Sequence, residues 1–100
     1  MKKIVLLCAA GMSTGMLVVK MREAAKEMSY DCDINAYAVA EANEVTKVAD
    51  IVLLGPQIRF QLDNIKKLCP DIPVEAINIQ DYGMMNGKNV LKTVKEKIGE

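Results

Sequence analysis

A cysteine followed at once by a loop of small residues is the feature of this sequence best suited to covalent chemistry. Cys8 ends the segment KIVLLC, which is apolar from Ile4 onward. The residues that follow it are Ala9, Ala10, Gly11, Met12, Ser13, Thr14 and Gly15. Small side chains let backbone N–H groups converge on an anion, and a helix beginning here would point its positive dipole end at the same space and favour a thiolate. We therefore predict that Cys8 is a nucleophile and that residues 9–15 bind a phosphate group.

Few other residues of the chain are of a type that acts as a nucleophile, a catalytic base or a metal ligand. The chain contains no histidine, which excludes a Ser–His or Cys–His catalytic pair and an imidazole metal ligand. Cys32 and Cys69 form no CxxC pair and precede no comparable loop, so we expect reduced, structural thiols. A cysteine at the end of a buried strand is also commonly a small apolar residue. Cys8, however, is followed directly by a loop that contains glycine, and this favours its interpretation as a nucleophile.

Composition limits the kind of molecule and its partners. The chain has 100 residues, 51% of them hydrophobic, and its 13 basic and 13 acidic residues cancel. This length suits one compact domain, residues 1–100. No dense basic cluster points to nucleic acid or an anionic membrane, and no apolar run nears the roughly 20 residues of a membrane span. We expect a cytoplasmic protein whose partners are proteins or small molecules, with no nucleic acid.

Hydrophobic periodicity predicts four strands, each followed by a helix. Residues 3–8 and 49–54 contain continuous apolar runs, which are typical of strands covered on both faces. Residues 32–39 and 73–79 mix polar with apolar positions and should lie at the margins of the sheet. Apolar residues repeat at helical spacing in the segments between these strands and after the last one, at 17–28, 40–47, 58–68 and 90–98.

This order of elements predicts an α/β fold and the place of its site. Right-handed crossovers favour a single three-layer domain with a four-stranded parallel sheet, order 2-1-3-4, and helices on both faces. Ligands bind such sheets beyond the carboxyl ends of the strands where the order reverses, here between the first and third strands. Residues 9–15 and the loop Gly55-Pro56-Gln57 should meet there. Gln57 is either a second-loop contact to phosphate or a structural residue at a helix start, and Pro56 favours the structural role.

The tyrosine phosphatases also place a cysteine below a phosphate-binding loop, and their C-x5-R signature adds an arginine. Thr14 stands at the arginine position in this chain. Without a guanidinium the site lacks the bidentate clamp that stabilises charge during hydrolysis. A low-molecular-weight tyrosine-phosphatase-like hydrolase is therefore the weaker alternative, and a carrier that passes its phosphoryl group onward is favoured.

Four segments carry a resemblance that covers essentially the whole chain. They are IVLLCAAGMSTGMLVVKMREAA, ADIVLLGPQIRFQL, PVEAINIQDYG and VLKTVKEKI. Together they resemble the IIB component of the lactose/cellobiose/chitobiose family of the bacterial sugar phosphotransferase system. The resemblance implies a four-stranded parallel α/β protein whose cysteine accepts phosphate from a phosphohistidine of the IIA component. That cysteine, matched by Cys8, then donates the phosphate to a sugar held by the membrane-embedded IIC component.

The mechanism implied by this resemblance consists of two displacements. The Cys8 thiolate attacks phosphorus in line, backbone amides of residues 10–15 stabilise the equatorial oxygens, and a sugar hydroxyl later displaces the thiolate. The scheme requires no metal and no organic cofactor. The implied sugar is a β-linked disaccharide such as cellobiose or chitobiose, and the protein associates with the membrane transporter. A noncatalytic phosphate- or redox-sensing module using Cys8 remains a third hypothesis.

Several residues near the predicted site have two interpretations each. Tyr82, in the stretch QDYG, approaches the site or a docking surface, or else packs in a turn. Met12 and Met16 flank the loop and suit an adaptable contact surface, although inward packing competes and is stronger for Met16. Lys20 and Arg22 steer an acidic partner or form a solvated helix face.

Overall fold

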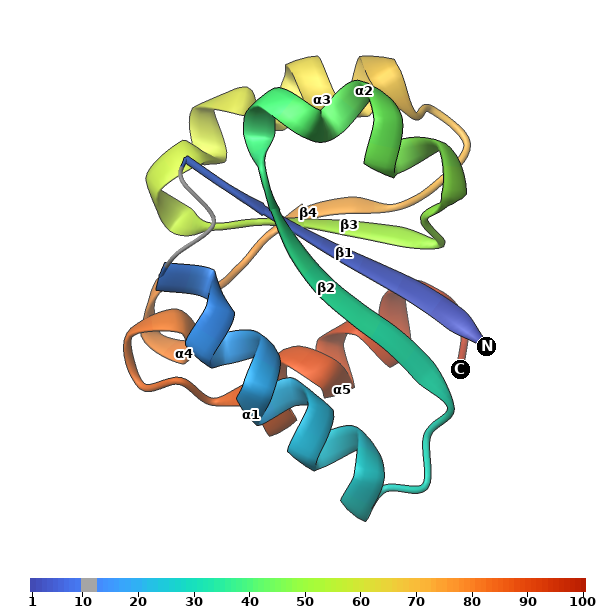
Figure 1. The fold of residues 1–100 in the computed structure, drawn as a ribbon, viewed down its shortest axis with the longest axis vertical. Helices are drawn as coiled ribbons and strands as arrows, with labels where there is room; N and C mark the ends of the chain where they lie inside the picture. The colour runs from blue at the N-terminus through green and yellow to red at the C-terminus, as the bar shows by residue number, and fades with distance from the viewer. Residues whose placement is uncertain (10–12) are drawn as a thin grey trace.

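The computed structural model describes residues 1–9 and 13–100, and these form an open α/β fold around one parallel sheet (Figure 1). The strands are β1 (Lys2–Cys8), β2 (Cys32–Ala38), β3 (Ile51–Leu54) and β4 (Val74–Ala76). Their order is β2-β1-β3-β4, and every neighbouring pair runs parallel. The predicted fold class and strand order are confirmed.

Helices cover both faces of the sheet. Figure 1 shows α1, α4 and α5 on one side and α2 and α3 on the other. The α-helices are α1 (Ser13–Glu27), α2 (Ala42–Val45), α3 (Leu62–Leu68), α4 (Ile79–Gly83) and α5 (Gly87–Lys97). Short 3-10 helices extend the second layer at η1 (Val39–Glu41), η2 (Thr46–Val48) and η3 (Pro56–Gln61). Each predicted helical segment is therefore present, with the two on the α2/α3 side partly wound as 3-10 turns.

The end of the last strand differs from the prediction. The strand expected over 73–79 stops at Ala76, and a short helix, α4, begins three residues later. Asn78 causes this change, because its side-chain oxygen accepts hydrogen bonds from the backbone N–H groups of Gln80 (2.8 Å) and Asp81 (3.2 Å). An asparagine cap of this kind starts a helix. The alternation of apolar residues before it resembles a strand and conceals the helix.

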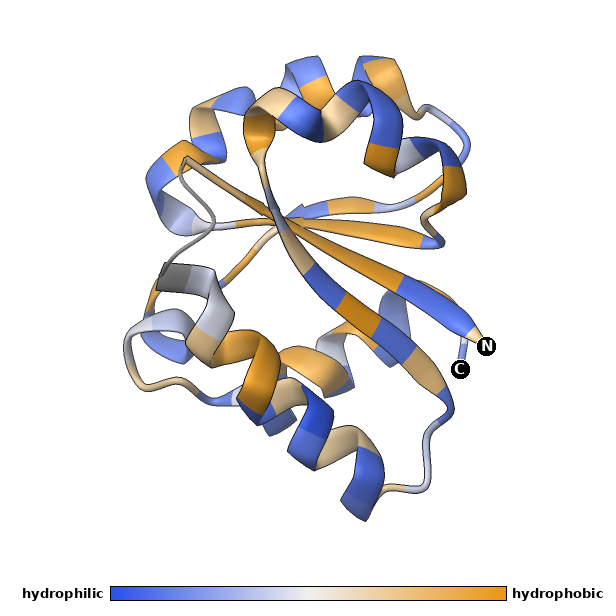
Figure 2. Ribbon diagram, in the orientation of Figure 1, coloured by the Kyte–Doolittle hydropathy of each residue, from blue (hydrophilic) through white to orange (hydrophobic). Residues whose placement is uncertain are grey.

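Buried apolar residues form two clusters, one on each face of the sheet, and this explains why the central strands contain continuous hydrophobic runs. Ile4 and Leu6 pack into the cluster under α1 and α5, whereas Val5 and Leu7 pack into the cluster under α2 and α3. Successive side chains of a strand point to opposite faces, so both sets are buried only when both faces are covered. Figure 2 shows β1 and β3 apolar over most of their length. Full burial of each such side chain contributes about 1.5–3 kcal/mol.

A glycine sets the distance between the helices of the α1/α5 layer. A Cβ on Gly87 would lie 2.5 Å from the carbonyl carbon of Lys20 and 2.5 Å from the backbone nitrogen of Met21. No side chain fits in that space, so α5 starts in direct contact with the backbone of α1. This contact holds α1, whose amino end lies at the carboxyl edge of the sheet.

Arg22 fastens α1 to the edge strand β2. Its Nε and Nη2 donate to the backbone carbonyl of Ile34 at 3.1 and 2.7 Å, and Nη2 also donates to Oδ1 of Asn35 at 2.9 Å. The guanidinium therefore satisfies a backbone carbonyl on the edge strand by hydrogen bonding. Neither role predicted for Arg22, steering or a solvated face, describes this structural function.

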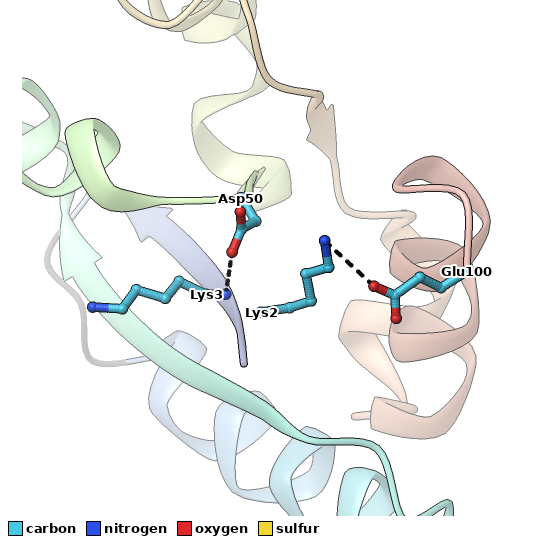
Figure 3. Close-up of polar contacts among 4 residues, drawn as sticks. All are labelled: Lys2, Lys3, Asp50 and Glu100. Carbon is cyan, nitrogen blue, oxygen red and sulfur yellow. Dashed lines mark hydrogen bonds and ion pairs between the residues drawn. The ribbon is translucent and has the colours of Figure 1, made fainter.

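The amino ends of the strands are fixed by charged side chains (Figure 3). The backbone N–H of Lys3 donates to Oδ2 of Asp50 at 2.7 Å, and the Asp50 N–H donates to the Lys3 carbonyl at 2.8 Å. Nζ of Lys2 lies 3.4 Å from Oε1 of Glu100. These contacts tie β1 to the turn before β3 and to the end of the chain.

Candidate functional site

Three strands end at one edge of the sheet and bring their following segments together. The Gly55 N–H donates to the Leu7 carbonyl at 2.8 Å, and the Ile77 N–H donates to the Leu54 carbonyl at 2.8 Å. Strand order reverses between β1 and β3, so residue 8 and residue 55 lie at the position where open α/β sheets bind ligands. The structure therefore brings Cys8, which precedes the first predicted loop, and Gly55, which begins the second, to the same edge.

Cys8 lies at this edge, but its side chain is covered. The residue is 2% exposed, and Sγ lies 3.0 Å from Oγ1 of Thr14. The sequence predicts a thiol facing an open crevice, and in this conformation the sulfur is instead packed among its neighbours. A sulfur anion here would lose water, which disfavours it unless hydrogen bonds and helix dipoles replace the solvent.

The amino end of α1 provides such groups next to the sulfur. The helix begins at Ser13, has no acidic residue in its first turn, and buries Thr14 completely. The first four N–H groups of a helix have no partner within the helix, and together they attract an anion. Space is open beside the Cα of Gly15, where a Cβ would meet nothing within 4 Å. This end of α1 can therefore accept a negatively charged group.

The predicted phosphate-binding residues are only partly within the described chain. Ala10, Gly11 and Met12 lie outside the described residues, and the exposed Ala9 follows the end of β1. Ser13 starts α1. The binding of phosphate by residues 9–15 thus stays a prediction.

The second loop approaches the end of β1 through Gly55. A Cβ placed on Gly55 would lie 2.9 Å from Oε1 of Gln57, 3.6 Å from Cβ of Cys8 and 3.6 Å from the Leu7 carbonyl oxygen. The Gln57 side chain therefore folds back toward Gly55. Pro56 begins η3, as expected of a proline at a helix start, and a contact of Gln57 with phosphate stays a prediction.

The pKa values of the other two cysteine thiols are raised. Burial, with the negative charge of Asp31 as the next cause, raises the pKa of the Cys32 thiol. Burial also raises the pKa of Cys69, whose Sγ donates to the Ile65 carbonyl at 3.2 Å. A raised pKa favours the neutral thiol at both positions, and their structural role stays a prediction.

Met16 and Tyr82, two residues near the predicted site, differ in how far they are buried. Met16, for which inward packing is the stronger prediction, is 58% exposed, because it lies off the buried stripe of α1 that includes Thr14 and Leu17. Tyr82 packs against the cluster under α1 and α5, and its buried hydroxyl has no hydrogen-bond partner within the part of the chain described. Packing, one of the two interpretations of Tyr82, is therefore observed.

Sequence reasoning places the loop Gly55-Pro56-Gln57 at the site but gives Gly55 no role of its own. Its importance comes from contact with Cys8, which lies 47 positions earlier in the chain. The available signal is a glycine directly after a buried strand, where backbone often approaches another segment closely. In addition, no group of three acidic, histidine or cysteine side chains among the described residues is arranged to hold a metal ion. None of the described helices is long and apolar enough to cross a membrane.

Comparison with known proteins identifies the family. Residues 3–93 match the family model described as "PTS system, Lactose/Cellobiose specific IIB subunit". The chain is 41% identical over 97 residues to the galactose-specific EIIB component of Lactococcus lactis subsp. cremoris, covering 90% of each chain. It is 42% identical over 90 residues to the oligo-beta-mannoside-specific EIIB component of Bacillus subtilis, covering 88% of this chain and 87% of that protein.

A solved structure agrees with these relatives. The solution structure of the cellobiose-specific phosphotransferase IIB component from Borrelia burgdorferi superimposes with a TM-score of 0.81 at 40% identity. The match covers 98% of this chain and 92% of that one. The present chain therefore belongs to the lactose/cellobiose-specific IIB family of the phosphotransferase system, whose members serve phosphoryl transfer in sugar transport.

Proposed function

We propose that Cys8 carries a phosphoryl group from a phosphohistidine of the IIA component to a sugar held by the membrane IIC component. One observation carries this proposal: Cys8 ends β1 at the reversal of strand order, with the Thr14 hydroxyl 3.0 Å from its sulfur. Family membership supports a role in phosphoryl transfer during sugar uptake. The position of Cys8 supports the sulfur as the atom that holds the group.

The proposed chemistry is two in-line displacements at phosphorus. In the first, the S–P bond of phosphocysteine forms as the N–P bond of phosphohistidine breaks. In the second, a sugar hydroxyl forms an O–P bond as the S–P bond breaks, and the sulfur leaves as a thiolate. Backbone N–H groups of residues 9–15, including the first turn of α1, would stabilise the phosphoryl oxygens during both steps.

Burial of the sulfur places a condition on this mechanism. Because Cys8 is 2% exposed, a phosphohistidine reaches its sulfur only if the residues around it move when the IIA component docks. Closure around the sulfur between docking events would protect a phosphocysteine from water. This arrangement suits a carrier better than a hydrolase, which must admit water.

Exposed apolar side chains surround the same edge and suit protein partners. Met16, Phe60, Ile79 and Met84 are all large and exposed, and they lie on or beside α1, η3 and α4. These three elements follow β1, β3 and β4, the strands whose carboxyl ends meet near Cys8. Exposed aromatic and methionine side chains are enriched in protein interfaces. We infer that the IIA and IIC components dock on this surface in turn.

The sugar is proposed from the relatives. Three relatives are named as EIIB components specific for galactose, oligo-beta-mannoside and cellobiose. We propose a β-linked disaccharide such as cellobiose or chitobiose, bound by the IIC component and not by this chain. Sugar phosphorylation measured with cognate IIC membranes and a panel of these sugars tests the choice.

We also infer that residues 1–100 act as one domain at the cytoplasmic face of the transporter. Both apolar clusters pack against opposite faces of one sheet and share β1 and β3. Neither layer of helices can bury its apolar face without that sheet. Cooperative unfolding in a single transition, seen by both circular dichroism and tyrosine fluorescence, is the expected result.

Incubation with the phosphorylated cognate IIA component tests the central proposal. Intact mass and peptide mapping should find one phosphoryl group on Cys8, and Cys8→Ser should abolish both this label and sugar phosphorylation. Cys69→Ser is the matched control and should behave as the parent protein. Labelling elsewhere in the chain would overturn the proposal, and steady release of free phosphate would instead indicate the hydrolase.

A further inference from the structure

Two threonines are the buried polar residues of the described chain, and their hydroxyls have different partners. Thr14 is 0% exposed and Thr46 is 4% exposed. Oγ1 of Thr46 donates to the carbonyl of Ala42, one turn earlier in the same helical segment, at 2.6 Å. This is the usual bond of a threonine within a helix. Oγ1 of Thr14 instead lies 3.0 Å from Sγ of Cys8.

The surroundings of the Thr14 hydroxyl increase its effect on the sulfur. Both residues are buried, so water does not compete for the contact. A buried anion is costly unless donors replace its hydration, and hydrogen bonds to charged groups are about twice as strong as neutral ones. A threonine in a helix also has few χ1 rotamers, so the hydroxyl is held in place at little entropic cost.

We propose that Thr14 is a positioning residue that donates a hydrogen bond to the Cys8 sulfur and stabilises it as a thiolate and as a leaving group. The leaving-group part rests on the proposed function of Cys8 as a phosphoryl carrier. The sequence-based prediction places Thr14 among the ligands of the phosphate. The geometry assigns its hydroxyl to the sulfur.

The contact should favour discharge of the phosphocysteine. When an oxygen nucleophile attacks, the O–P bond forms, the S–P bond breaks, and the sulfur takes the bonding electron pair. The proton of the attacking hydroxyl or water goes to solvent. Negative charge grows on Sγ during this step, so a hydrogen bond from Thr14 is stronger in the transition state than in the phosphocysteine. Loss of the hydroxyl should therefore slow release of the phosphoryl group.

The first experiment measures alkylation of Cys8 by iodoacetamide as a function of pH, with peptide mapping to separate the three cysteines. Thr14→Val removes the hydroxyl at similar size, and Thr14→Ser retains it. We expect the alkylation midpoint of Thr14→Val to lie about one pH unit above that of the parent protein, equivalent to about tenfold. Thr14→Ser should stay close to the parent. Thr46→Val, the matched buried control, should leave the midpoint unchanged.

The second experiment follows the phosphocysteine itself. The protein is charged by the phosphorylated IIA component, separated from it, and left in buffer while phosphate release is measured. Thr14→Val should lose its phosphoryl group about tenfold more slowly than the parent or Thr14→Ser. If Thr14→Val does not fold by circular dichroism, Thr14→Ala is used for the same two measurements.

The outcomes separate this inference from the proposed function. An alkylation midpoint of Thr14→Val equal to that of the parent overturns the role of Thr14, whether or not Cys8 is phosphorylated. A shifted midpoint with unchanged phosphate release overturns the leaving-group part alone. A shifted midpoint in a protein that is never phosphorylated on Cys8 supports the sulfur contact and overturns the carrier function.

Discussion

The two ends of the sheet use their side chains in opposite ways. At the amino end, Lys2 pairs with Glu100, and Lys3 and Asp50 exchange backbone and side-chain hydrogen bonds (Figure 3). At the carboxyl end, a buried hydroxyl meets the buried Cys8 sulfur, and the elements that follow β1, β3 and β4 carry large exposed apolar side chains. Polar groups at the first end hold the chain together, whereas those at the second are available to a reaction. Substitutions at the two ends should therefore affect different measurements.

Gly55→Ala should give the largest effect, at the carboxyl end. The added Cβ would lie 2.9 Å from Oε1 of Gln57 and 3.6 Å from Cβ of Cys8, so the Gln57 side chain must move. Misplacement of a group near reacting atoms by about 1 Å can cost on the order of 100-fold in rate. We expect a loss approaching that size in the rate of phosphoryl transfer from the IIA component, measured by rapid quench.

The stability of Gly55→Ala should change little, because the displaced atom is the far end of a flexible side chain. Gly83→Ala is the control, since a Cβ there meets nothing within 4 Å. Its transfer rate should equal that of the parent protein. A normal rate in Gly55→Ala would show that the second loop does not shape the site.

Asp50→Ala should give the reverse result at the amino end. It removes the carboxylate that accepts the Lys3 N–H at 2.7 Å. Loss of a charge-assisted hydrogen bond at this partly exposed position should lower the free energy of unfolding by about 1–2 kcal/mol. Urea denaturation measures this loss, and Asp50→Asn, which keeps an acceptor oxygen, should lose less. A changed transfer rate in the folded Asp50→Ala protein would contradict the separation of the two ends.

The fold is predictable from the sequence because its causes are local. Every position from 4 to 8 and from 51 to 54 is apolar, and short continuous runs of this kind are typical of strands covered on both faces. Helix α4 is not predictable in the same way, because the apolar residues before it alternate like a strand. Only the hydrogen bonds of the Asn78 cap distinguish the two possibilities.

The candidate site is predictable in position but not in its contacts. The junction of Cys8 with a small-residue loop locates the site, because topology brings the carboxyl ends of β1 and β3 together. Spacing cannot reveal that the Thr14 side chain turns toward the sulfur or that Gly55 touches Cys8. Nor can it reveal that Cys8 is buried while Met16 is exposed. These features depend on how α1 is rotated and how closely two loops approach.

Phe60→Ser tests whether the exposed apolar side chains at the carboxyl end serve docking. Phe60 is 75% exposed, so its loss should change the free energy of unfolding by no more than about 0.5 kcal/mol. If it contacts the IIA component, the concentration of that component needed for half-maximal transfer should rise about fivefold to tenfold. Val48→Ser is the control, because Val48 is 61% exposed and lies before β3, toward the amino end. Equal effects of the two substitutions would argue against a defined docking surface.

Tyr30→Phe should have the smallest effect and only at high pH, at the amino end. Burial, followed by the nearby Glu100 carboxylate, raises the pKa of Tyr30 to about 12, whereas an unfolded tyrosine has a pKa of about 10. Because the folded state favours the neutral phenol, its contribution to stability is complete below pH 10 and is lost as the pH rises toward 12. The parent protein should therefore lose stability more steeply than Tyr30→Phe over this interval.

Urea denaturation at several pH values from 9 to about 12 measures the difference between the two proteins. The phenylalanine ring keeps the contact with Lys95, whose Nζ lies 4.9 Å from the centroid of the Tyr30 ring, so this interaction is nearly matched in the pair. The alkylation rate of Cys8 should be the same in both proteins, since Tyr30 lies before β2 at the opposite end of the sheet. Parallel stability curves would show that the phenol ionises as easily in the folded state as in the unfolded state, and the amino end would then contribute to stability through its ion pair and backbone contacts alone.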